Sequence, residues 1–532
     1  MKKFNIAGPM KENKHYVIPP LSRLDLKEVL EHIDDEKYFI MHAPRQSGKT
    51  SSLLALQKYI NERNDYVAIY INVECGQASR NNFEKGIKDI LNELKSRAIK
   101  VLGHKEEIKR IYKEISDNQS FGYALNEFIQ ELCQLSEKPL VLFIDEIDSL
   151  IGDTLIAVLR QLRSGYDMRP EYFPQSIILC GIVDIKDYKI HRSNDDIITG
   201  GSCFNIKSES FRLGNFSKKQ IIVLYNAHTQ ETDQIFESNV FDLAWEYTAG
   251  QPWLVNALAY EACFKMRENR DRSIPITAEL FEQAKENLIL SRVTHLDQLA
   301  DKLNEDRVRR VIEPMLIGDN SLATYDDQQY CIDLGLIKKT EKGLTISNAI
   351  YKEVFPRELT ASLQQNFLSA FSPEWVNEDN SINTNKLMTL FQQFWRENSE
   401  IWSSHIAGYH EAAPHLVFHG FLQRVSNGYG IIEREYGLHR KRTDIYLRWN
   451  APMGQQRIVF ELKIRTEREN TSEKFEKLKT ESLKQITEYA DICGANESHL
   501  VIFDRRQDMR WDEKIYSRTS EYEGYKINIW GA

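Results

Sequence analysis

The chain has 532 residues and a mass of 62.1 kDa, which predicts three or four domains at about 150 residues per domain. Hydrophobic residues make up 42% and charged residues 28% of the chain, a balance typical of globular proteins and not of disordered ones. The net charge of -9 excludes a protein that is basic over its whole surface, although it is compatible with a local basic groove.

Short apolar runs alternate with helical stretches in the first third of the chain. The runs 38–42, 66–72, 139–145 and 176–181 are predicted strands, and residues 82–136 are predicted to be mainly helical. Continuous apolar strands separated by helices are typical of a parallel α/β sheet with both faces covered. Residues 1–214 are therefore predicted to form one α/β core.

A phosphate-binding loop is predicted between the first strand and the helix after it. Its sequence matches the P-loop pattern, except that Ala43 stands at the first glycine. Backbone N–H groups at a strand-to-helix turn bind phosphate oxygens, and the helix N-terminus adds to the attraction. We expect Lys49 to reach the β- and γ-phosphates of ATP and Thr50 to hold Mg²⁺. The residues expected to contact the nucleotide here are Ala43, Pro44, Arg45, Gln46, Ser47, Gly48, Lys49, Thr50 and Ser51.

Two acids follow the predicted strand over residues 139–145. We expect Asp145 to support Mg²⁺, and Glu146 to orient and deprotonate the water that attacks the γ-phosphate. Asp148 is expected to cap the next helix. Solvated acids at a strand end are the alternative, and the P-loop in the same α/β core favours the ATPase interpretation.

These motifs resemble those of AAA-like P-loop ATPases of the STAND or archaeal type. Residues 215–290 have a helical pattern, and Gly250-Gln251-Pro252 resembles the Gly-x-Pro motif of the helical lid in that group. The resemblance implies that Pro252 lies near the nucleotide. It also implies a nucleotide-dependent homo-oligomer in which an arginine of a neighbouring subunit completes the site. Arg160 and Arg163 are candidates for this arginine, and a solvated helix face explains them equally well.

Residues 291–360 are predicted to form a winged helix, which resembles the domain that follows the lid in such ATPases. Two helices over 305–317 and 325–334 precede a hairpin over 337–346. The second helix carries Asp326, Asp327 and Asp333 and no lysine or arginine. Phosphate contacts supply most non-specific DNA affinity, so we expect this domain to mediate packing or assembly and not DNA recognition. Residues 361–395 are predicted to be a helical connector.

A second chemical centre is predicted within residues 396–532. Glu461 and Lys463 share one face of a strand because side chains alternate along it, and Asp444 can lie beside them on the adjacent strand. Two close carboxylates repel unless a cation lies between them, and Mg²⁺, or Mn²⁺ in its place, suits such oxygen ligands. Lys463 would then activate water and stabilise charge on a phosphate.

The arrangement of Asp444, Glu461 and Lys463 resembles the active site of PD-(D/E)XK nucleases. The expected order agrees: a helix over 411–425, a strand over 430–436, the two site strands, a helix over 472–489 and a strand over 499–503. The resemblance implies that Glu411 is an accessory acid and Gln485 the helix glutamine. The first motif reads Arg-Thr-Asp where the family often has Pro-Asp. Basic residues around Asp444 suit a nucleic acid, with DNA the expected one: Arg434, Arg440, Lys441, Arg442 and Arg448.

The predicted fold is therefore a multidomain α/β chain. It combines a P-loop parallel α/β sheet, a helical lid, a winged helix and a C-terminal PD-(D/E)XK-type α/β domain. We expect an ATP-binding and ATP-hydrolysing switch that controls a metal-dependent endonuclease, and the domain order resembles prokaryotic families linked to anti-phage defence or mobile elements. The rival is a STAND-like regulator or scaffold whose C-terminal domain binds nucleic acid or a partner without cleavage.

Other features narrow the expected setting. No apolar run approaches the ~20 residues that span a bilayer, and the N-terminus lacks the apolar segment of a secretory signal. The seven cysteines are scattered, as is usual for reduced thiols. We therefore expect a cytoplasmic protein with no membrane partner. His415 and His419 lie four residues apart without an evident third ligand, so packing is favoured over zinc binding.

Overall fold

The computed structural model describes residues 1–117, 120–182, 190–191, 197–198, 209–291, 294–316, 323–341, 343–359, 375–405, 412–425, 430–438, 441–465, 471–504, 506 and 509–532. These residues form two compact units. The first comprises Met1–His295 and Gln328–Ala349, and the second comprises Leu296–Asp327 and Ile350–Ala532.

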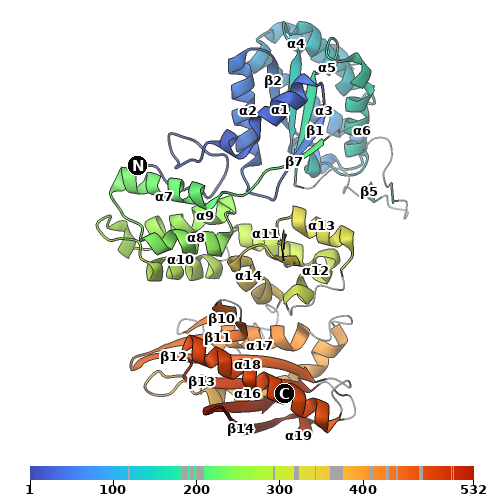
Figure 1. Cartoon of the computed structure of the whole chain (residues 1–532). Helices are drawn as coiled ribbons and strands as arrows, with labels where there is room; N and C mark the ends of the chain where they lie inside the picture. Colours follow the sequence, from blue (N-terminus) through green and yellow to red (C-terminus); the bar gives the residue numbers. More distant parts are fainter. Residues whose placement is uncertain are drawn as a thin grey trace. The chain divides into compact units, whose positions relative to one another are not determined.

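A five-stranded parallel sheet lies at the centre of the first unit (Figure 1). The predicted strands and the predicted parallel sheet are confirmed. The last strand was not predicted, because its sequence Glu-Ser-Phe-Arg is short and polar. In spatial order, the strands are β2 (Val67–Asn72), β3 (Leu140–Asp145), β4 (Ser176–Gly181), β1 (Phe39–His42) and β7 (Glu209–Arg212).

Alternate residues of β1, β2, β3 and β4 enter two different hydrophobic cores, which explains why these four strands are apolar throughout. Ile40 and Ile69 belong to one core, whereas Met41 and Ala68 belong to the other. The first core is covered by α3 (Phe83–Leu102), α4 (Lys105–Asp117), α5 (Ala124–Leu135) and α6 (Gly152–Ser164), and the second by α1 (Leu26–Asp34) and α2 (Lys49–Arg63).

The predicted helical segment 215–290 is confirmed as helical. The N-terminal segment of the chain packs against these helices. Its Phe4 and Tyr16 are buried and contact the rings of Tyr225 and His228. This packing was not predicted, because so short a terminal segment has no periodic pattern. The helices are α7 (Lys218–Thr232), α8 (Ser238–Thr248), α9 (Pro252–Tyr260) and α10 (Ala278–Leu290), with a π-helical turn over Glu261–Lys265.

The elements predicted over residues 291–360 are present, and the winged-helix classification stays a prediction. The antiparallel hairpin of β8 (Ile337–Thr340) and β9 (Gly343–Ile346) lies within the first unit. Most of α11 (Thr294–Leu303) and all of α12 (Asp306–Leu316) lie within the second. The division passes through α13 (Tyr325–Asp333), and α14 (Ala349–Leu359) follows the hairpin.

A six-stranded mixed sheet forms the centre of the second unit. The pair β12–β13 and the pair β13–β15 are parallel, and the other neighbours are antiparallel. In spatial order, the strands are β10 (Gly430–Leu438), β11 (Lys441–Ala451), β12 (Gly454–Arg465), β13 (Glu497–Asp504), β15 (Tyr525–Gly531) and β14 (Tyr516–Tyr522).

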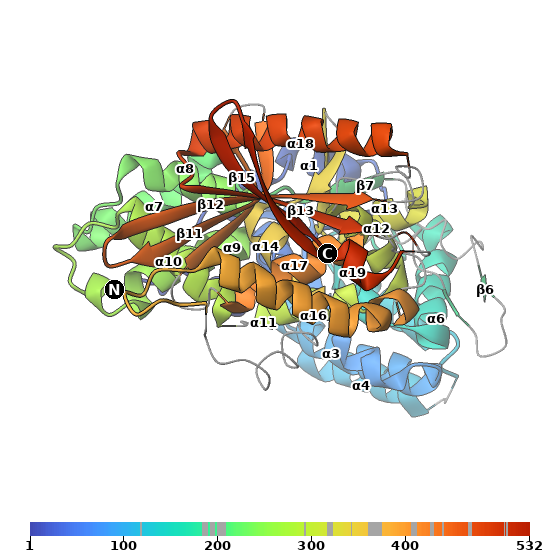
Figure 2. The same ribbon diagram turned by 90° about the horizontal axis from the view of Figure 1, so that it is seen from below.

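Helices cover both faces of this sheet (Figure 2). Helix α18 (Ser472–Cys493) covers one face, while α16 (Thr384–His405) and α17 (Ala412–Val425) cover the other. Helix α16 crosses the predicted boundary between residues 395 and 396. Its Phe391 packs against Phe418 of α17, so this part of the predicted connector belongs to the C-terminal core. The short helix α19 (Trp511–Lys514) precedes β14.

Two features of the structure bear on the expected setting of the chain, its helix hydropathy and its cysteines. In the described part of the chain, no helix combines the length and the apolar character needed to cross a bilayer. Cysteines in the same part of the chain are free thiols, four of which are buried.

Candidate functional site

The predicted phosphate-binding loop joins β1 to α2. Gly48 precedes the helix with φ of 91°, and Gln46 has φ of 56°. A side chain at Gly48 would be strained by this φ, and its Cβ would lie 2.9 Å from Nη1 of Arg23. The turn therefore requires glycine here, and it leaves the N–H groups at the start of α2 without helical partners, as a phosphate site needs.

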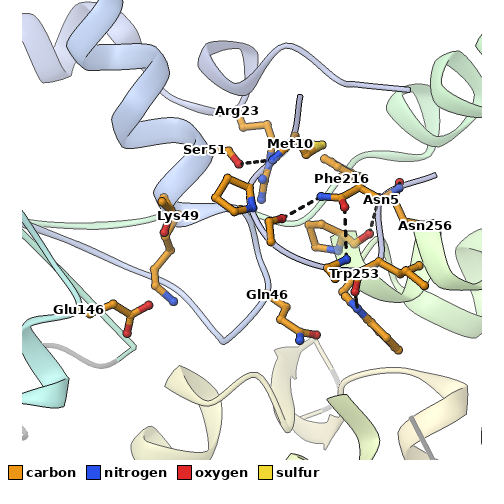
Figure 3. A pocket seen from close by; sticks show the side chains of 17 residues that line it. Asn5, Met10, Arg23, Gln46, Lys49, Ser51, Glu146, Phe216, Trp253 and Asn256 are labelled. Atoms are coloured by element: carbon orange, nitrogen blue, oxygen red, sulfur yellow. Dashed lines mark hydrogen bonds between the residues drawn. The ribbon is translucent and has the colours of Figure 1, made fainter. Parts of the chain in front are cut away.

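Lys49 lies over this loop and is only 6% exposed. Its Nζ donates hydrogen bonds to the backbone oxygens of Ala43 at 2.9 Å and Pro44 at 3.2 Å. Figure 3 shows its ammonium group pointing toward Glu146. Because neutral carbonyl oxygens hold the ammonium group in place, its charge can act on a phosphate.

The carboxylate of Asp145 is fully buried at the end of β3. Its Oδ2 accepts hydrogen bonds from the Thr50 hydroxyl at 2.7 Å and from the Tyr70 hydroxyl at 2.9 Å. Its Oδ1 accepts from the backbone N–H of Glu146 at 3.0 Å. The structure thus brings together Thr50 and Asp145, the predicted Mg²⁺ residues. Tyr70 was missed because it lies inside an ordinary apolar strand.

Glu146 follows Asp145 in a left-handed conformation with φ of 59°. Burial and the negative charge of Asp148 raise the pKa of Glu146, and Lys49 opposes this shift. The prediction that Asp148 caps the next helix is wrong. The chain first makes a 3-10 turn over Ile147–Ser149, and the residue before α6 is Ile151. Burial raises the pKa of Asp148 as well.

A cavity of about 260 Å³ extends from this loop (Figure 3). It is lined by three parts of the first unit: the P-loop with Glu146, the start of α9 with the predicted Pro252, and the N-terminal segment. The contribution of the N-terminal segment to this cavity was not predicted. The lining residues of the three parts include Gln46, Gly48, Lys49, Thr50, Ser51, Glu146, Pro252, Trp253, Asn256 and the segment 5–10.

Hydrogen bonds hold the N-terminal segment in this cavity wall. Trp253 donates from its indole N–H to the backbone oxygen of Ile6 at 2.9 Å, and the backbone N–H of Asn5 donates to Oδ1 of Asn256 at 3.2 Å. The backbone N–H of Met10 lies 3.4 Å from the Ser51 hydroxyl. The segment therefore bridges the P-loop helix α2 and helix α9.

The motif Gly250-Gln251-Pro252 lies at the start of α9. Gly250 has φ of 74°, and its oxygen accepts from the backbone N–H of Phe216 at 2.8 Å; a Cβ there would clash with the oxygen of Phe216. The side chain of Gln251 accepts from Leu254 N at 2.6 Å and caps the helix, and Pro252 occupies its first turn.

The residues named for a neighbouring subunit lie on α6. Arg160 and Arg163 are exposed. Gln161 between them is buried, and its side-chain oxygen accepts from the backbone N–H of Leu125 at 2.8 Å. Gln161 therefore fixes α6 to α5, and the two arginines stay candidates.

The second predicted centre lies on β12, on the face covered by α18. The carboxylate of Glu461 is fully buried, and its Oε1 lies 2.7 Å from Nζ of Lys463. Oε1 of Gln485 is 3.4 Å from the same Nζ, and Gln485 donates to the Tyr489 hydroxyl at 2.9 Å. The structure brings Glu461, Lys463 and Gln485 together as predicted. Tyr489, one helical turn beyond Gln485, was missed.

Asp444 lies on β11, the neighbour of β12. Ile445 of β11 pairs with Phe460 of β12, so the antiparallel register extended by one residue brings the backbone of Asp444 opposite Glu461. The side chain of Asp444 lies outside the described part, as do Glu411 and the side chains of Arg434, Arg440, Lys441 and Arg442. Arg448 is half-buried, and His419 is buried. Within the described residues, no group of three or more histidine, cysteine, aspartate or glutamate side chains is arranged to hold a metal ion.

Comparison with known proteins gives one family match. A family model described as an AAA-like domain matches residues 26–357. No curated protein matches the chain.

Solved structures similar to the chain belong to distant proteins. A Walker-type ATPase of Pyrococcus abyssi is 15% identical with a TM-score of 0.45, covering 66% of this chain and 99% of its own. The ORC2 protein of Aeropyrum pernix is 12% identical with a TM-score of 0.37, covering 66% and 97%. The RuvB Holliday junction branch migration motor of Thermotoga maritima is 11% identical with a TM-score of 0.33, covering 62% and 95%.

Proposed function

Because the chain belongs to the AAA-like domain family, we propose that it binds and hydrolyses ATP and that its nucleotide state controls a metal-dependent nuclease domain. The observation that carries the ATPase proposal is the pairing of Thr50 with Asp145 beside the buried Lys49. The nuclease proposal rests on the contacts of Lys463 with Glu461 and Gln485.

The cavity suits a nucleoside triphosphate because its two ends differ in chemistry. The end at Lys49 is cationic and adjoins the start of α2, which favours phosphates. The other end offers the Trp253 ring, which suits a purine base. We therefore propose that the triphosphate lies against Lys49 and that the base lies between the N-terminal segment and α9.

The residues at the phosphate end have separate roles in the proposed hydrolysis. Thr50 and Asp145 would hold Mg²⁺, which when bound supplies positive charge to the phosphates. Glu146 would orient a water molecule and take its proton, and its raised pKa makes it a stronger base than an ordinary glutamate. Lys49 would stabilise the negative charge that develops on the phosphoryl oxygens.

The second centre contains the groups that phosphodiester cleavage requires. Asp444 and Glu461 would hold Mg²⁺ or Mn²⁺, a charge that makes bound water more acidic and neutralises the phosphate. Lys463 would orient the attacking water or stabilise charge on the phosphate, and Gln485 would keep Lys463 in place. Nucleic acid, with DNA as the first choice, is the proposed substrate.

Assembly and biological setting complete the proposal. We infer that the protein forms a nucleotide-dependent homo-oligomer, with Arg160 or Arg163 facing the nucleotide of a neighbour. The acidic helix α13 makes the winged-helix segment better suited to packing than to DNA recognition. Anti-phage defence or mobile-element biology stays a prediction from the domain order.

Incubation with nucleic acid tests the nuclease directly. Purified protein is mixed with plasmid, linear DNA or RNA, with Mg²⁺ or Mn²⁺, and with or without ATP. We expect cleavage by the wild type that Lys463→Ala abolishes, because this variant loses the ammonium group beside Glu461. Lys526→Ala, which removes an exposed lysine of the same sheet, is the matched control and should cut normally.

Two outcomes would contradict the nuclease proposal. Wild-type protein that cuts nothing under any of these conditions would favour the rival scaffold. Cleavage that survives in Lys463→Ala would come from another site or from a contaminant.

The rival function has one observation in its favour. Lys463 forms an ion pair with the buried Glu461, and such a pair is also a reasonable structural feature. A scaffold that signals through assembly would change its elution volume in size-exclusion chromatography between ATP and ADP while cutting nothing. Identical elution profiles would contradict an assembly switch.

A further inference from the structure

The turn that follows α13 belongs to the first unit and lies against the phosphate-binding loop. Gly335 in this turn has φ of 75°. Its backbone N–H donates to the oxygen of Ile332 at 2.9 Å, and the N–H of Leu336 donates to the oxygen of Cys331 at 3.0 Å. This pattern ends a helix, and it favours glycine because of the left-handed conformation.

Gly335 also approaches Pro44 of the loop more closely than a helix end requires. A Cβ built on Gly335 would lie 2.5 Å from Cγ and 3.0 Å from Cβ of Pro44. Gly103 and Gly494 also end helices with positive φ, and they lack so close a neighbour. Gly494 ends α18 with φ of 60°, and the nearest atom to its added Cβ is Nη1 of Arg457 at 3.4 Å. The contact with Pro44 is therefore a separate feature of Gly335.

A hydrogen bond at the end of β7 fixes the same turn. Arg212 donates from Nη2 to the backbone oxygen of Ile332 at 2.6 Å. The next residue, Leu213, donates from its backbone N–H to the oxygen of His42 at 3.0 Å, at the point where β1 enters the loop. The turn and the base of the loop are thus bonded to two consecutive residues, Arg212 at the end of β7 and Leu213 directly after it.

Pro44 in turn provides the acceptor that orients Lys49. Its backbone oxygen accepts from Nζ of Lys49 at 3.2 Å and from the Ser47 hydroxyl at 2.7 Å. A displacement of Pro44 would therefore move the ammonium group proposed to contact phosphate and loosen the turn that precedes Gly48.

We propose that Gly335 is a positioning residue for nucleotide binding, and that it acts on Lys49 through Pro44. The effect on nucleotide rests on the proposed ATP-binding function, whereas the effect on the loop does not. Because coupling between two sites is reciprocal, nucleotide bound at the loop should also restrain the segment that continues from Gly335 into the hairpin β8–β9.

Hydrogen exchange and nucleotide binding in one set of variants test this proposal. Gly335→Ala should accelerate amide exchange over residues 43–50 in the nucleotide-free protein, and it should weaken binding of a fluorescent ATP analogue by about tenfold or more. ATP should slow exchange over residues 337–346 in the wild type. Gly494→Ala places the same strain at a helix end far from Pro44 in the sequence, and it should change neither readout.

A double variant separates the positioning role of Gly335 from a general loss of stability. In the background of Pro44→Gly, which removes both atoms that a new Cβ would meet, Gly335→Ala should have no further effect on the loop. An undiminished effect in that background, or normal exchange and affinity in Gly335→Ala alone, would overturn the proposal.

Two further outcomes are distinguishable. If Gly335→Ala does not fold, Arg212→Lys carries the test: losing the bond to Ile332 should accelerate exchange over 43–50, and unchanged exchange would overturn the proposal. If the wild type binds no nucleotide, the proposed ATPase fails, and the exchange of the loop still decides the role of Gly335.

Discussion

The two candidate centres each contain one lysine, but the protein holds the two lysines differently. Neutral backbone oxygens of the loop hold Lys49. A buried carboxylate holds Lys463, with its Nζ 2.7 Å from Glu461. The first ammonium therefore keeps its charge available for a ligand, whereas the second is neutralised until a ligand competes for one of the partners.

This difference means that the first centre is preorganised and the second must rearrange. Binding phosphate at Lys49 breaks no ion pair, so the interaction can contribute fully to affinity. In the proposed nuclease, Glu461 would help to hold the divalent cation, and Lys463 would act on the phosphate. Variants at each centre test this difference between the two lysines and their neighbours.

Lys49→Ala should weaken ATP binding by about 100-fold or more, because it removes charge-assisted hydrogen bonds to phosphate. A fluorescent ATP analogue titrated into the variant measures the effect. Lys463→Ala is the control and should bind ATP as the wild type does. Normal affinity in Lys49→Ala would refute the assignment of the loop.

Glu146→Gln should reduce ATP turnover by about 100-fold or more while changing ATP affinity only a few-fold, because an amide cannot accept the proton of the attacking water. Phosphate release under saturating ATP measures turnover. An unchanged rate would refute the role of Glu146 as the base. The proposed nucleotide-binding role of the first centre would remain.

Gln485→Ala should slow nucleic acid cleavage by about tenfold, a smaller effect than Lys463→Ala, because it removes one neutral hydrogen-bond partner of Lys463. Cleavage rates with saturating Mg²⁺ provide the measurement. Gln455→Ala, at an exposed position of β12, the strand that carries Lys463, should be neutral. Equal rates in the two variants would show that Lys463 does not depend on Gln485.

Asp148→Asn should produce the smallest effect, a shift in the pH profile of ATP hydrolysis. A base works only when deprotonated, so activity falls as the pH drops through the raised pKa of Glu146. Removing the negative charge of Asp148 lowers that pKa, and the acidic limb of the profile should move to lower pH. A shift in the opposite direction would contradict the assignment of this limb to Glu146.

Elements with a strong local pattern were predictable. The strand before Lys49 and the strand that ends at Asp145 are apolar runs next to motifs, and both lie where predicted. The alternation of Ile458 and Phe460 with Glu461 also gave the correct face of β12. Asp148 was misplaced because its type suits a helix cap, whereas the 3-10 turn that displaces it has no such signal.

Partners distant in sequence were not predictable. Tyr70 bonds to Asp145 from another strand, and Trp253 bonds to Ile6 across nearly half of the chain. Tyr70 and Trp253 lie outside the motifs, so only the fold shows that they adjoin the first centre.

Hydrophobic period and turn residues act over a few neighbours, so the sequence predicts the type of each local element and the chemistry of its motifs. Only the packed fold brings certain distant groups together: the N-terminal segment with α9, Tyr70 with Asp145, and Gly335 with Pro44. These contacts depend on how whole elements pack, and no local pattern of residues encodes that packing.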